Sequence, residues 1–253
     1  MKILAFNGSP RKKNSNTDKI LQPFLEGARE AGAETETVYL QGKKIAPCLG
    51  CFKCWFDTPG ECCQKDDHPE LLKKFVDCDT VVYATPLYIF GMTAQMKLFL
   101  DRIVPMAMPF IEIVDGHCTH PARAEHRVKS MVVMSNCGFH ELDNFDELMA
   151  HFRAISKHSR VKIAGALLRP HGEFLQFADQ FLPDLVKPVY EAAREAGRQL
   201  VKNGVISDEV QAEVAKELMP LEGFLMGANE TFKKMIEEGK GLEEMAKEAR
   251  PIE

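Results

Sequence analysis

Residues 2–17 read Lys-Ile-Leu-Ala-Phe-Asn-Gly-Ser-Pro-Arg-Lys-Lys-Asn-Ser-Asn-Thr. The first five form a short apolar run, which predicts a buried strand over 2–6. The run ends in Asn-Gly-Ser-Pro, a sequence typical of a loop. From Thr17 to about Ala31, apolar residues recur at helical spacing until Gly32 ends the pattern. The stretch therefore predicts a strand, a loop and a helix, in that order.

The same alternation continues along the chain. Further strands are predicted over 35–40, 80–85, 130–134 and 161–168, and further helices over 69–78, 93–104, 144–158 and 182–203. The run Thr80–Thr85 is β-branched and apolar, as in a central strand, and Pro86 ends it. Five strands that alternate with helices predict an α/β fold with a doubly wound, five-stranded parallel sheet and helices on both faces.

The composition is that of an ordinary globular protein, with 253 residues, 45% hydrophobic and 27% charged. A net charge of −5 argues against a nucleic-acid partner, because proteins that bind nucleic acids usually carry a basic stripe on their surface. No run is long and apolar enough for a membrane span, and the N-terminal run is too short for a secretory signal. We therefore expect a cytoplasmic protein with no membrane partner.

The end of the chain differs from the rest. Residues 205–253 contain amphipathic helical patterns and no predicted strand. We expect a main domain over 1–204, with a cysteine-rich loop at 46–67 inserted after the second strand. The helical extension over 205–253 is expected to pack in an oligomer or to form a lid.

The loop at 7–17 has two chemical interpretations. It matches neither Gly-x-x-x-x-Gly-Lys-Ser/Thr nor Gly-x-Gly-x-x-Gly, so it fits neither a nucleoside triphosphate nor a dinucleotide loop. Its polar or cationic side chains are Ser9, Arg11, Ser15, Asn16 and Thr17. Beside the free N–H groups of a helix start, these suit a phosphate monoester. The alternative is an ordinary strand-to-helix turn with a cap at Ser15 or Asn16.

The loop after the third strand is apolar, because residues 87–90 read Leu-Tyr-Ile-Phe. Ligands of open α/β sheets bind beyond the carboxyl ends of the strands, so this loop and 135–142 are candidate site walls. Apolar and aromatic side chains there suit a flat ring, and Gly91 permits a close approach of the backbone. The same side chains would also suit a neighbouring subunit, and both interpretations stay open.

Eight cysteines need a chemical explanation, and in a reducing cytosol metal binding or redox chemistry is favoured over disulfides. The clustered ones are Cys48, Cys51, Cys54 and Cys62, with Cys63 adjacent. Serial C-x2-C-x2-C spacing is how bacterial ferredoxins supply thiolates to a cubane, whereas structural zinc more often uses separated pairs. The spacing favours a four-iron four-sulfur cluster. Zinc, and metal-free thiols packed under Trp55, remain as alternatives.

Two motifs together resemble the NAD(P)H-dependent FMN reductase family of flavodoxin-like proteins. They are Gly8-Ser9-Pro10-Arg11 with Ser15-Asn16-Thr17, and Pro86-Leu87-Tyr88-x-x-Gly91-Met92-Thr93-Ala94-Gln95-Met96-Lys97 with Asp101-Arg102. A third stretch is similar to the iron–sulfur flavoprotein branch of that family: Cys48-Leu-Gly-Cys51-Phe-Lys-Cys54-Trp55, then Gly60-Glu61-Cys62 and Asp66-Asp67. The resemblance covers roughly residues 1–200 and is clearest up to Arg102.

The resemblance implies which residues bind the cofactors. The FMN phosphate would be held by Ser9, Arg11, Ser15, Asn16 and Thr17. The isoalloxazine would be lined by Pro86, Leu87, Tyr88, Ile89, Phe90 and Gly91, and bordered by Asn136, Cys137 and Gly138. The cluster ligands would be Cys48, Cys51, Cys54 and Cys62. No catalytic residue is assigned, because hydride transfer to a flavin is the chemistry of the cofactor.

We therefore expect an FMN-dependent oxidoreductase that takes electrons from NAD(P)H or a protein donor. It would pass them to a small-molecule or protein redox partner, through the iron–sulfur cluster where one is bound. The resemblance also implies paired subunits, as a homodimer or homotetramer. Two alternatives are a flavodoxin-type electron carrier without enzymatic activity and a zinc-stabilised binding module. The basic run Arg11-Lys12-Lys13 and the clustered cysteines argue against the carrier.

Overall fold

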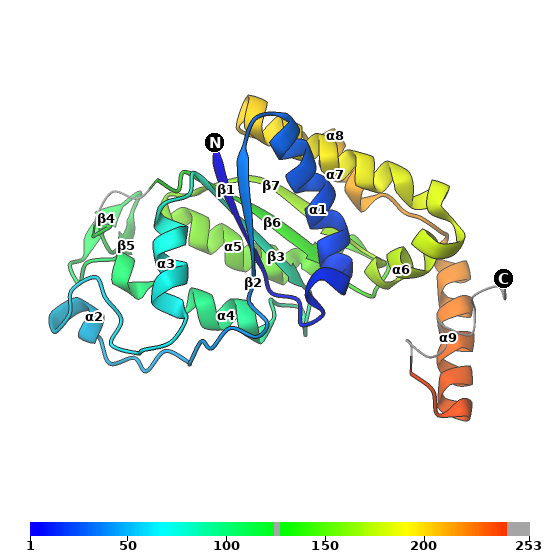
Figure 1. Cartoon of the computed structure of the whole chain (residues 1–253), viewed down its shortest axis with the longest axis horizontal. Coiled ribbons are helices and arrows are strands. Elements are labelled where there is room, and N and C mark those ends of the chain that lie inside the picture. The colour runs from blue at the N-terminus through cyan, green and yellow to red at the C-terminus, as the bar shows by residue number, and fades with distance from the viewer. Residues whose placement is uncertain (124–126, 242–253) are drawn as a thin grey trace.

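The computed structural model describes residues 1–123 and 127–241. Its centre is a five-stranded parallel sheet in the order β2-β1-β3-β6-β7, with helices on both faces (Figure 1). The strands are β1 (Lys2–Asn7), β2 (Glu34–Tyr39), β3 (Thr80–Pro86), β6 (Ser130–Asn136) and β7 (Lys162–Arg169). The predicted doubly wound flavodoxin-like fold is confirmed, and each strand lies close to its predicted bounds.

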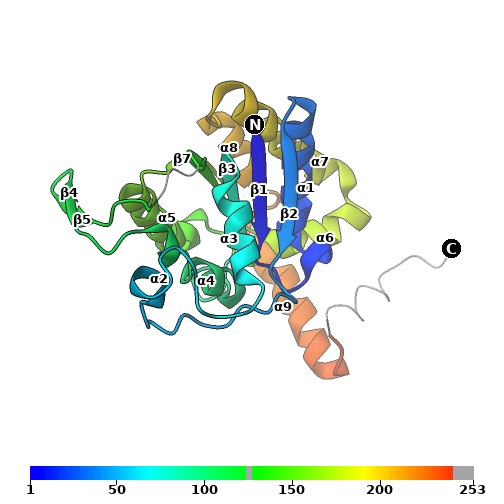
Figure 2. The same cartoon turned by 60° about the vertical axis from the view of Figure 1, so that its left-hand side comes forward.

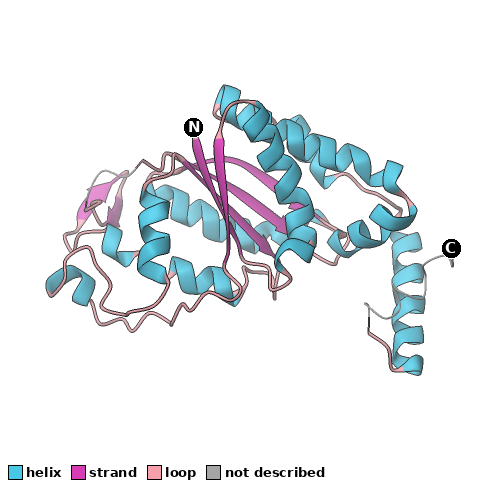
Figure 3. Ribbon diagram, viewed as in Figure 1, coloured by secondary structure: helices cyan, strands magenta, loops and turns pink. Residues whose placement is uncertain are grey.

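Two apolar layers sandwich the sheet, because alternate side chains of a strand point to opposite faces. One layer includes Ile3, Ala5 and Val82, and the other includes Leu4, Phe6 and Val81. The helices over the first layer are α1 (Asn16–Glu30), α6 (Gly172–Phe181), α7 (Pro183–Asn203) and α8 (Asp208–Ala215). Those over the second are α3 (His68–Val76), α4 (Ala94–Leu100) and α5 (Asp146–Ser159), as Figures 2 and 3 show.

Some elements carry no clear sequence signal and were not predicted. A hairpin of β4 (Glu112–Val114) and β5 (His117–Thr119) has no buried side chain, so it lacks a hydrophobic period. Helix α6 begins after His171, whose φ is 62° and which supplies no capping side chain. The other short elements are α2 (Lys53–Phe56), η1 (Lys12–Asn14), η2 (Val104–Met106) and η3 (Leu142–Phe145).

The C-terminal segment divides into a packed part and a projecting part. Ile206 and Val214 are buried in the same core layer as α1 and α7. Helix α9 (Leu221–Glu238) has no buried residue and extends away from the sheet (Figures 1 and 2). Residues 242–253 of the expected extension lie outside the described residues. Across the described ranges, no helix has both the length and the apolar character that a bilayer crossing requires.

Two glycines let α1 and α7 pack at backbone contact. A Cβ added at Gly27 would lie 1.8 Å from the carbonyl oxygen of Arg194. One added at Gly197 would lie 1.9 Å from the carbonyl oxygen of Phe24. Neither position therefore accepts a side chain without separating the helices. This contact fixes α1, whose N-terminus follows the first loop.

Gly27→Ala should lower the free energy of unfolding by about 1–3 kcal/mol or more, because the methyl group overpacks a backbone contact. Gly227→Ala in α9 is the matched control, since no heavy atom lies within 4 Å of its added Cβ. The control should leave stability unchanged or raise it by up to about 1 kcal/mol. Urea denaturation of both variants measures the difference, and equal stabilities would contradict the packing argument.

Candidate functional site

Three loops meet at the carboxyl edge of the sheet and are tied together by hydrogen bonds. The Thr93 hydroxyl donates to the Gly8 carbonyl oxygen at 2.8 Å and so joins the loops after β1 and β3. The Leu87 N–H donates to the Asn136 carbonyl oxygen at 2.8 Å. The Thr17 hydroxyl donates to Asn136 Oδ1 at 2.6 Å, which joins α1 to the end of β6. The structure thus brings the predicted flavin loops together.

The first loop is a capped strand-to-helix turn, as one of its two interpretations predicted. Ser15 is the N-cap of α1, and its Oγ accepts the Asp18 N–H at 3.1 Å. The same hydroxyl donates to the Lys12 carbonyl oxygen at 2.6 Å. The buried Ser9 Oγ accepts the Arg11 N–H at 3.3 Å. A well-formed cap also presents the helix N-terminus, so it leaves the anion-binding interpretation open.

Unpaired buried polar groups at this edge point to a ligand. The Asn16 side chain is 2% exposed, and neither its Nδ2 nor its Oδ1 has a hydrogen-bond partner within the described ranges. The Ser135 hydroxyl, at the end of β6, is buried and unpaired in the same way. A buried polar group without a partner costs about 1–3 kcal/mol. The donor set at the start of α1 therefore fits the phosphate of FMN, which would satisfy Asn16.

Arg11 lies beside the same turn but has a protein partner. Its guanidinium forms an ion pair with Glu173, in the first turn of α6, with Nη1 to Oε2 at 3.2 Å. Both side chains are exposed, and such pairs contribute about 0–1 kcal/mol. A phosphate dianion would therefore compete with a weak pair. Glu173 had no sequence signal, because it lies 162 positions away and on the unpredicted helix α6.

The predicted ring-lining loop, 86–91, contains a strained turn. Tyr88 and Gly91 exchange two backbone hydrogen bonds, at 2.9 and 3.1 Å. Between them, Ile89 and Phe90 have φ values of 48° and 59°, in the left-handed region. That region costs a residue with a side chain about 1–2 kcal/mol. Pro86 is buried and Leu87 half-buried, whereas Tyr88, Ile89 and Phe90 are exposed. Backbone strain of this kind concentrates at ligand sites.

The loop after β6 places its three predicted residues at the same edge. Asn136 is buried, and Cys137 is buried with its thiol donating to the Phe139 carbonyl oxygen at 3.4 Å. Burial raises the pKa of the Cys137 thiol. Gly138 is exposed, with no heavy atom within 4 Å of an added Cβ. Open space therefore lies over the backbone of this loop.

His171 is a buried residue of this edge that the sequence analysis missed. Its backbone N–H donates to the Phe139 carbonyl oxygen at 2.7 Å, which ties the end of β7 to the loop after β6. Its Nδ1 is buried and unpaired within the described ranges. Burial, then the nearby charges of His140 and Arg169, lowers the pKa of His171 to about 4. The imidazole is therefore neutral at physiological pH.

The cysteine loop forms a separate pocket beside η2. Its sulfur-bearing lining residues are Cys48, Cys51, Cys54, Cys62 and Cys63. The sulfurs of Cys51 and Cys63 lie 3.9 Å apart. In the part of the chain that is described, no three potential ligands are already arranged to hold a metal ion. The thiol chemistry fits iron–sulfur or zinc, and binding either one would require the loop to draw its sulfurs together.

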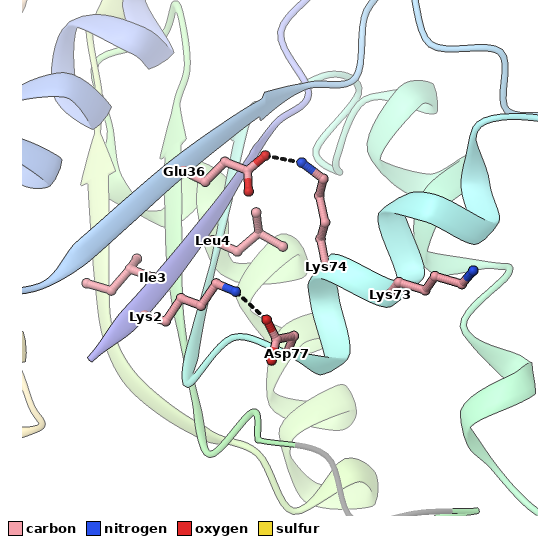
Figure 4. Close-up of a pocket in the computed structure, with 7 residues that line it drawn as sticks. All are labelled: Lys2, Ile3, Leu4, Glu36, Lys73, Lys74 and Asp77. Carbon is pink, nitrogen blue, oxygen red and sulfur yellow. Dashed lines mark hydrogen bonds and ion pairs between the residues drawn. The ribbon is translucent and has the colours of Figure 1, made fainter.

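A hollow of about 330 Å³ lies elsewhere, over the amino-terminal half of β1 and beside α3 (Figure 4). Ion pairs Lys2–Asp77 and Lys74–Glu36 border it. It contains none of the predicted site residues, and four of its charged side chains neutralise one another in pairs. We therefore assign the candidate site to the carboxyl edge.

Ile89→Gly should raise the free energy of unfolding by about 0.5–1 kcal/mol. The relief of left-handed strain, about 1–2 kcal/mol, exceeds the entropic cost of glycine, about 0.5–1 kcal/mol. Little packing is lost, because Ile89 is 95% exposed. Ile111→Gly is the control, since Ile111 is exposed without a positive φ and its replacement should lower stability. Denaturant titration checks both, and a loss of stability in Ile89→Gly would contradict the strain.

Solved structures resemble this fold across most of the chain. The FMN-dependent NADH-azoreductase of Bacillus anthracis matches with a TM-score of 0.57 at 17% identity, covering 79% of this chain and 99% of that one. The NAD(P)H:quinone oxidoreductase of Methanothermobacter marburgensis matches with a TM-score of 0.55 at 18% identity, covering 79% and 96%. At such identities the similarity establishes the fold alone.

Sequence relatives match a shorter segment, about two fifths of the chain. An iron-sulfur flavoprotein of Archaeoglobus fulgidus is 42% identical over 105 residues, which cover 42% of this chain and 46% of that protein. An iron-sulfur flavoprotein of Methanosarcina thermophila is 38% identical over 104 residues, covering 41% and 53%. The matched segment thus spans about half the length of these relatives.

A family model supplies the assignment. The model described as NADPH-dependent FMN reductase matches residues 1–144, more than half of the 253-residue chain. The matched range holds the first loop, the cysteine loop, the strained turn and the loop after β6. Its extent agrees with the motifs that first suggested the family. The chain therefore belongs to the NADPH-dependent FMN reductase family.

Proposed function

We propose that this protein is an FMN-dependent oxidoreductase that accepts electrons from NAD(P)H. The observation that carries the proposal is the convergence of three loops at one sheet edge, together with the buried and unpaired Asn16 side chain at the start of α1. Membership of the reductase family supports the cofactor and the electron donor. The substrate that finally receives the electrons is a small molecule or a redox protein.

The phosphate end of FMN would lie at the start of α1. Ser9, Asn16 and Thr17 supply polar groups there, and the N-cap Ser15 keeps the first helical N–H groups directed at the ligand. Arg11 would exchange its exposed partner Glu173 for the phosphate, or hold both. A charge-assisted hydrogen bond contributes about 1.5–3 kcal/mol, more than the exposed ion pair.

The ring end would lie between residues 86–91 and 136–138. Leu87 and Tyr88 offer apolar surface, and the exposed backbone of Gly138 permits a close approach. Bound FMN supplies the redox chemistry, and the chain supplies binding, orientation and exclusion of water. The backbone hydrogen bond from Leu87 to Asn136 joins the two walls, and those of Thr93 and Thr17 tie the walls to the first loop and to α1. No side chain of the site needs to act as an acid or base in hydride transfer.

We also propose that the chain works as a homodimer or homotetramer. Tyr88, Ile89 and Phe90 expose large apolar side chains at the edge of the site. A neighbouring subunit would cover this surface and complete a pocket for a flat substrate. Size-exclusion chromatography with light scattering gives the subunit number.

The cysteine loop is proposed to bind a four-iron four-sulfur cluster through Cys48, Cys51, Cys54 and Cys62. Support comes from the serial spacing, from the shared pocket of the thiols and from relatives named iron-sulfur flavoproteins. When bound, the cluster would accept or donate single electrons. Zinc remains the competing occupant.

The flavin assignment is tested with purified protein and Arg11→Ala. Heat should release FMN and no FAD, and NADPH or NADH should bleach the bound flavin under anaerobic conditions. Arg11→Ala should weaken FMN roughly tenfold or more and leave riboflavin binding nearly unchanged, as measured by fluorescence titration. Lys13→Ala is the matched control in the same loop and should lose less affinity for FMN. Equal losses for FMN and riboflavin would contradict a phosphate contact, and flavin not reduced by either nucleotide would contradict the reductase.

The cluster is tested by anaerobic reconstitution with iron and sulfide. About four irons and four sulfides per chain are expected, and each of Cys48→Ala, Cys51→Ala, Cys54→Ala and Cys62→Ala should lose them. Cys63→Ala is the adjacent control and should retain the cluster. About one zinc per chain without labile sulfide would instead establish a zinc site. Loss of the cluster in Cys63→Ala but not in Cys62→Ala would show that the fourth ligand is Cys63.

A further inference from the structure

A buried arginine closes the cysteine pocket. Arg102 follows α4, is 1% exposed and lines the pocket with the five thiols. Among the described residues that line the pocket, it carries the only full positive charge. A buried arginine requires several hydrogen bonds, because taking its charge out of water is costly. The partners of Arg102 therefore indicate what it holds.

Among the described residues, every hydrogen-bond partner of its guanidinium lies in the cysteine loop, 46–67. Nη1 forms an ion pair with Asp66 and donates to the Ala46 carbonyl oxygen at 3.2 Å. Asp66 also accepts the N–H groups of Ala46 at 2.9 Å and His68 at 3.1 Å. Burial alone would raise the pKa of Asp66, but these hydrogen bonds, led by that of Arg102, lower it. The pair therefore fastens the two ends of the loop.

The remaining contact of Arg102 selects one thiol. Its Nη2 donates to Cys62 Sγ at 3.3 Å. Cys63, the next residue, is exposed and contacts Cys51 instead. Arg102 Nε is buried and has no partner within the described residues. A buried guanidinium with one unpaired N–H, facing a set of thiols, suits a negatively charged group in the pocket.

We propose that Arg102 is a positioning residue that fixes Cys62, and not Cys63, as the fourth thiolate of the cysteine pocket. This inference rests on the proposed cluster for its redox consequence and on the contacts above for the choice of thiol. Hydrogen bonds to ligand sulfurs and nearby charge set the potential of an iron–sulfur cluster. Removing the guanidinium should therefore lower the midpoint potential, since the reduced cluster carries more negative charge.

The first arm of the test needs no metal. Metal-stripped wild type, Arg102→Gln, Arg102→Lys and Lys53→Gln are treated with iodoacetamide, and mass spectrometry follows labelling of Cys62 relative to Cys63. Arg102→Gln should change the relative labelling of Cys62 about tenfold, the equivalent of one charge-assisted hydrogen bond, because the sulfur loses both the cation and the group that covers it. Arg102→Lys keeps the charge but not the planar fork, and it should show a smaller change in the same direction. Lys53→Gln removes an exposed cation of the same loop that lies near Cys63 and has no hydrogen bond to Cys62, so it should change the ratio far less.

The second arm measures the anaerobically reconstituted proteins, with circular dichroism as the check on folding. Arg102→Gln should have a lower midpoint potential than wild type, and a larger shift than Lys53→Gln. Loss of iron from folded Arg102→Gln, with retention in Arg102→Lys, also supports positioning. If Arg102→Gln does not fold, Arg102→Lys supplies the same comparison.

Unchanged labelling of Cys62 in the folded Arg102 variants would overturn the inference. A potential shift no larger than that of Lys53→Gln would overturn its redox consequence. Wild type that takes up neither iron nor sulfide would refute the proposed cluster. In that case the labelling arm alone would support or refute the role of Arg102, so the two failures remain distinguishable.

Discussion

The burial of the central strands on both faces is the constraint on which the rest of the structure depends. Every residue of β3 is buried, so its backbone groups must be paired within the sheet and its side chains must be covered by helices. Crossover helices that cover both faces make neighbouring strands parallel. All carboxyl ends then lie at one edge, and the loops that follow β1, β3 and β6 have to meet there.

The meeting of those loops is made specific by a few short polar side chains. Thr93 is the N-cap of α4 and bonds the Gly8 carbonyl oxygen, while Thr17 lies in the first turn of α1 and bonds Asn136. The contact of α1 with α7 through Gly27 and Gly197 holds α1 against the sheet. With the scaffold fixed in this way, the turn at Ile89 and Phe90 can remain strained and exposed. A rigid edge with one strained loop and one unpaired amide is suited to binding a ligand.

The cysteine loop is held in place differently from the other loops, because it lies outside the sheet and has little core of its own. Trp55 donates its indole N–H to the Val104 carbonyl oxygen at 3.2 Å and stacks on Phe52. Arg102 and Asp66 fasten the loop from the other side. The thiols therefore share a pocket although the described residues hold no finished metal site. Holding a metal would require the loop to draw these sulfurs together, and the loop lies outside the sheet.

By itself, the sequence determined the local patterns: five apolar runs, the capped turn at Ser15, and the serial cysteines. These depend on neighbours along the chain, so periodicity and spacing reveal them. Tertiary structure alone decided the pairings across long separations, such as Arg11 with Glu173, Thr17 with Asn136, and Arg102 with Cys62. The sequence did not predict helix α6 or the role of His171, because the start of α6 lacks a capping side chain. Contacts of this kind arise only when distant segments pack at one edge, and no local pattern encodes them.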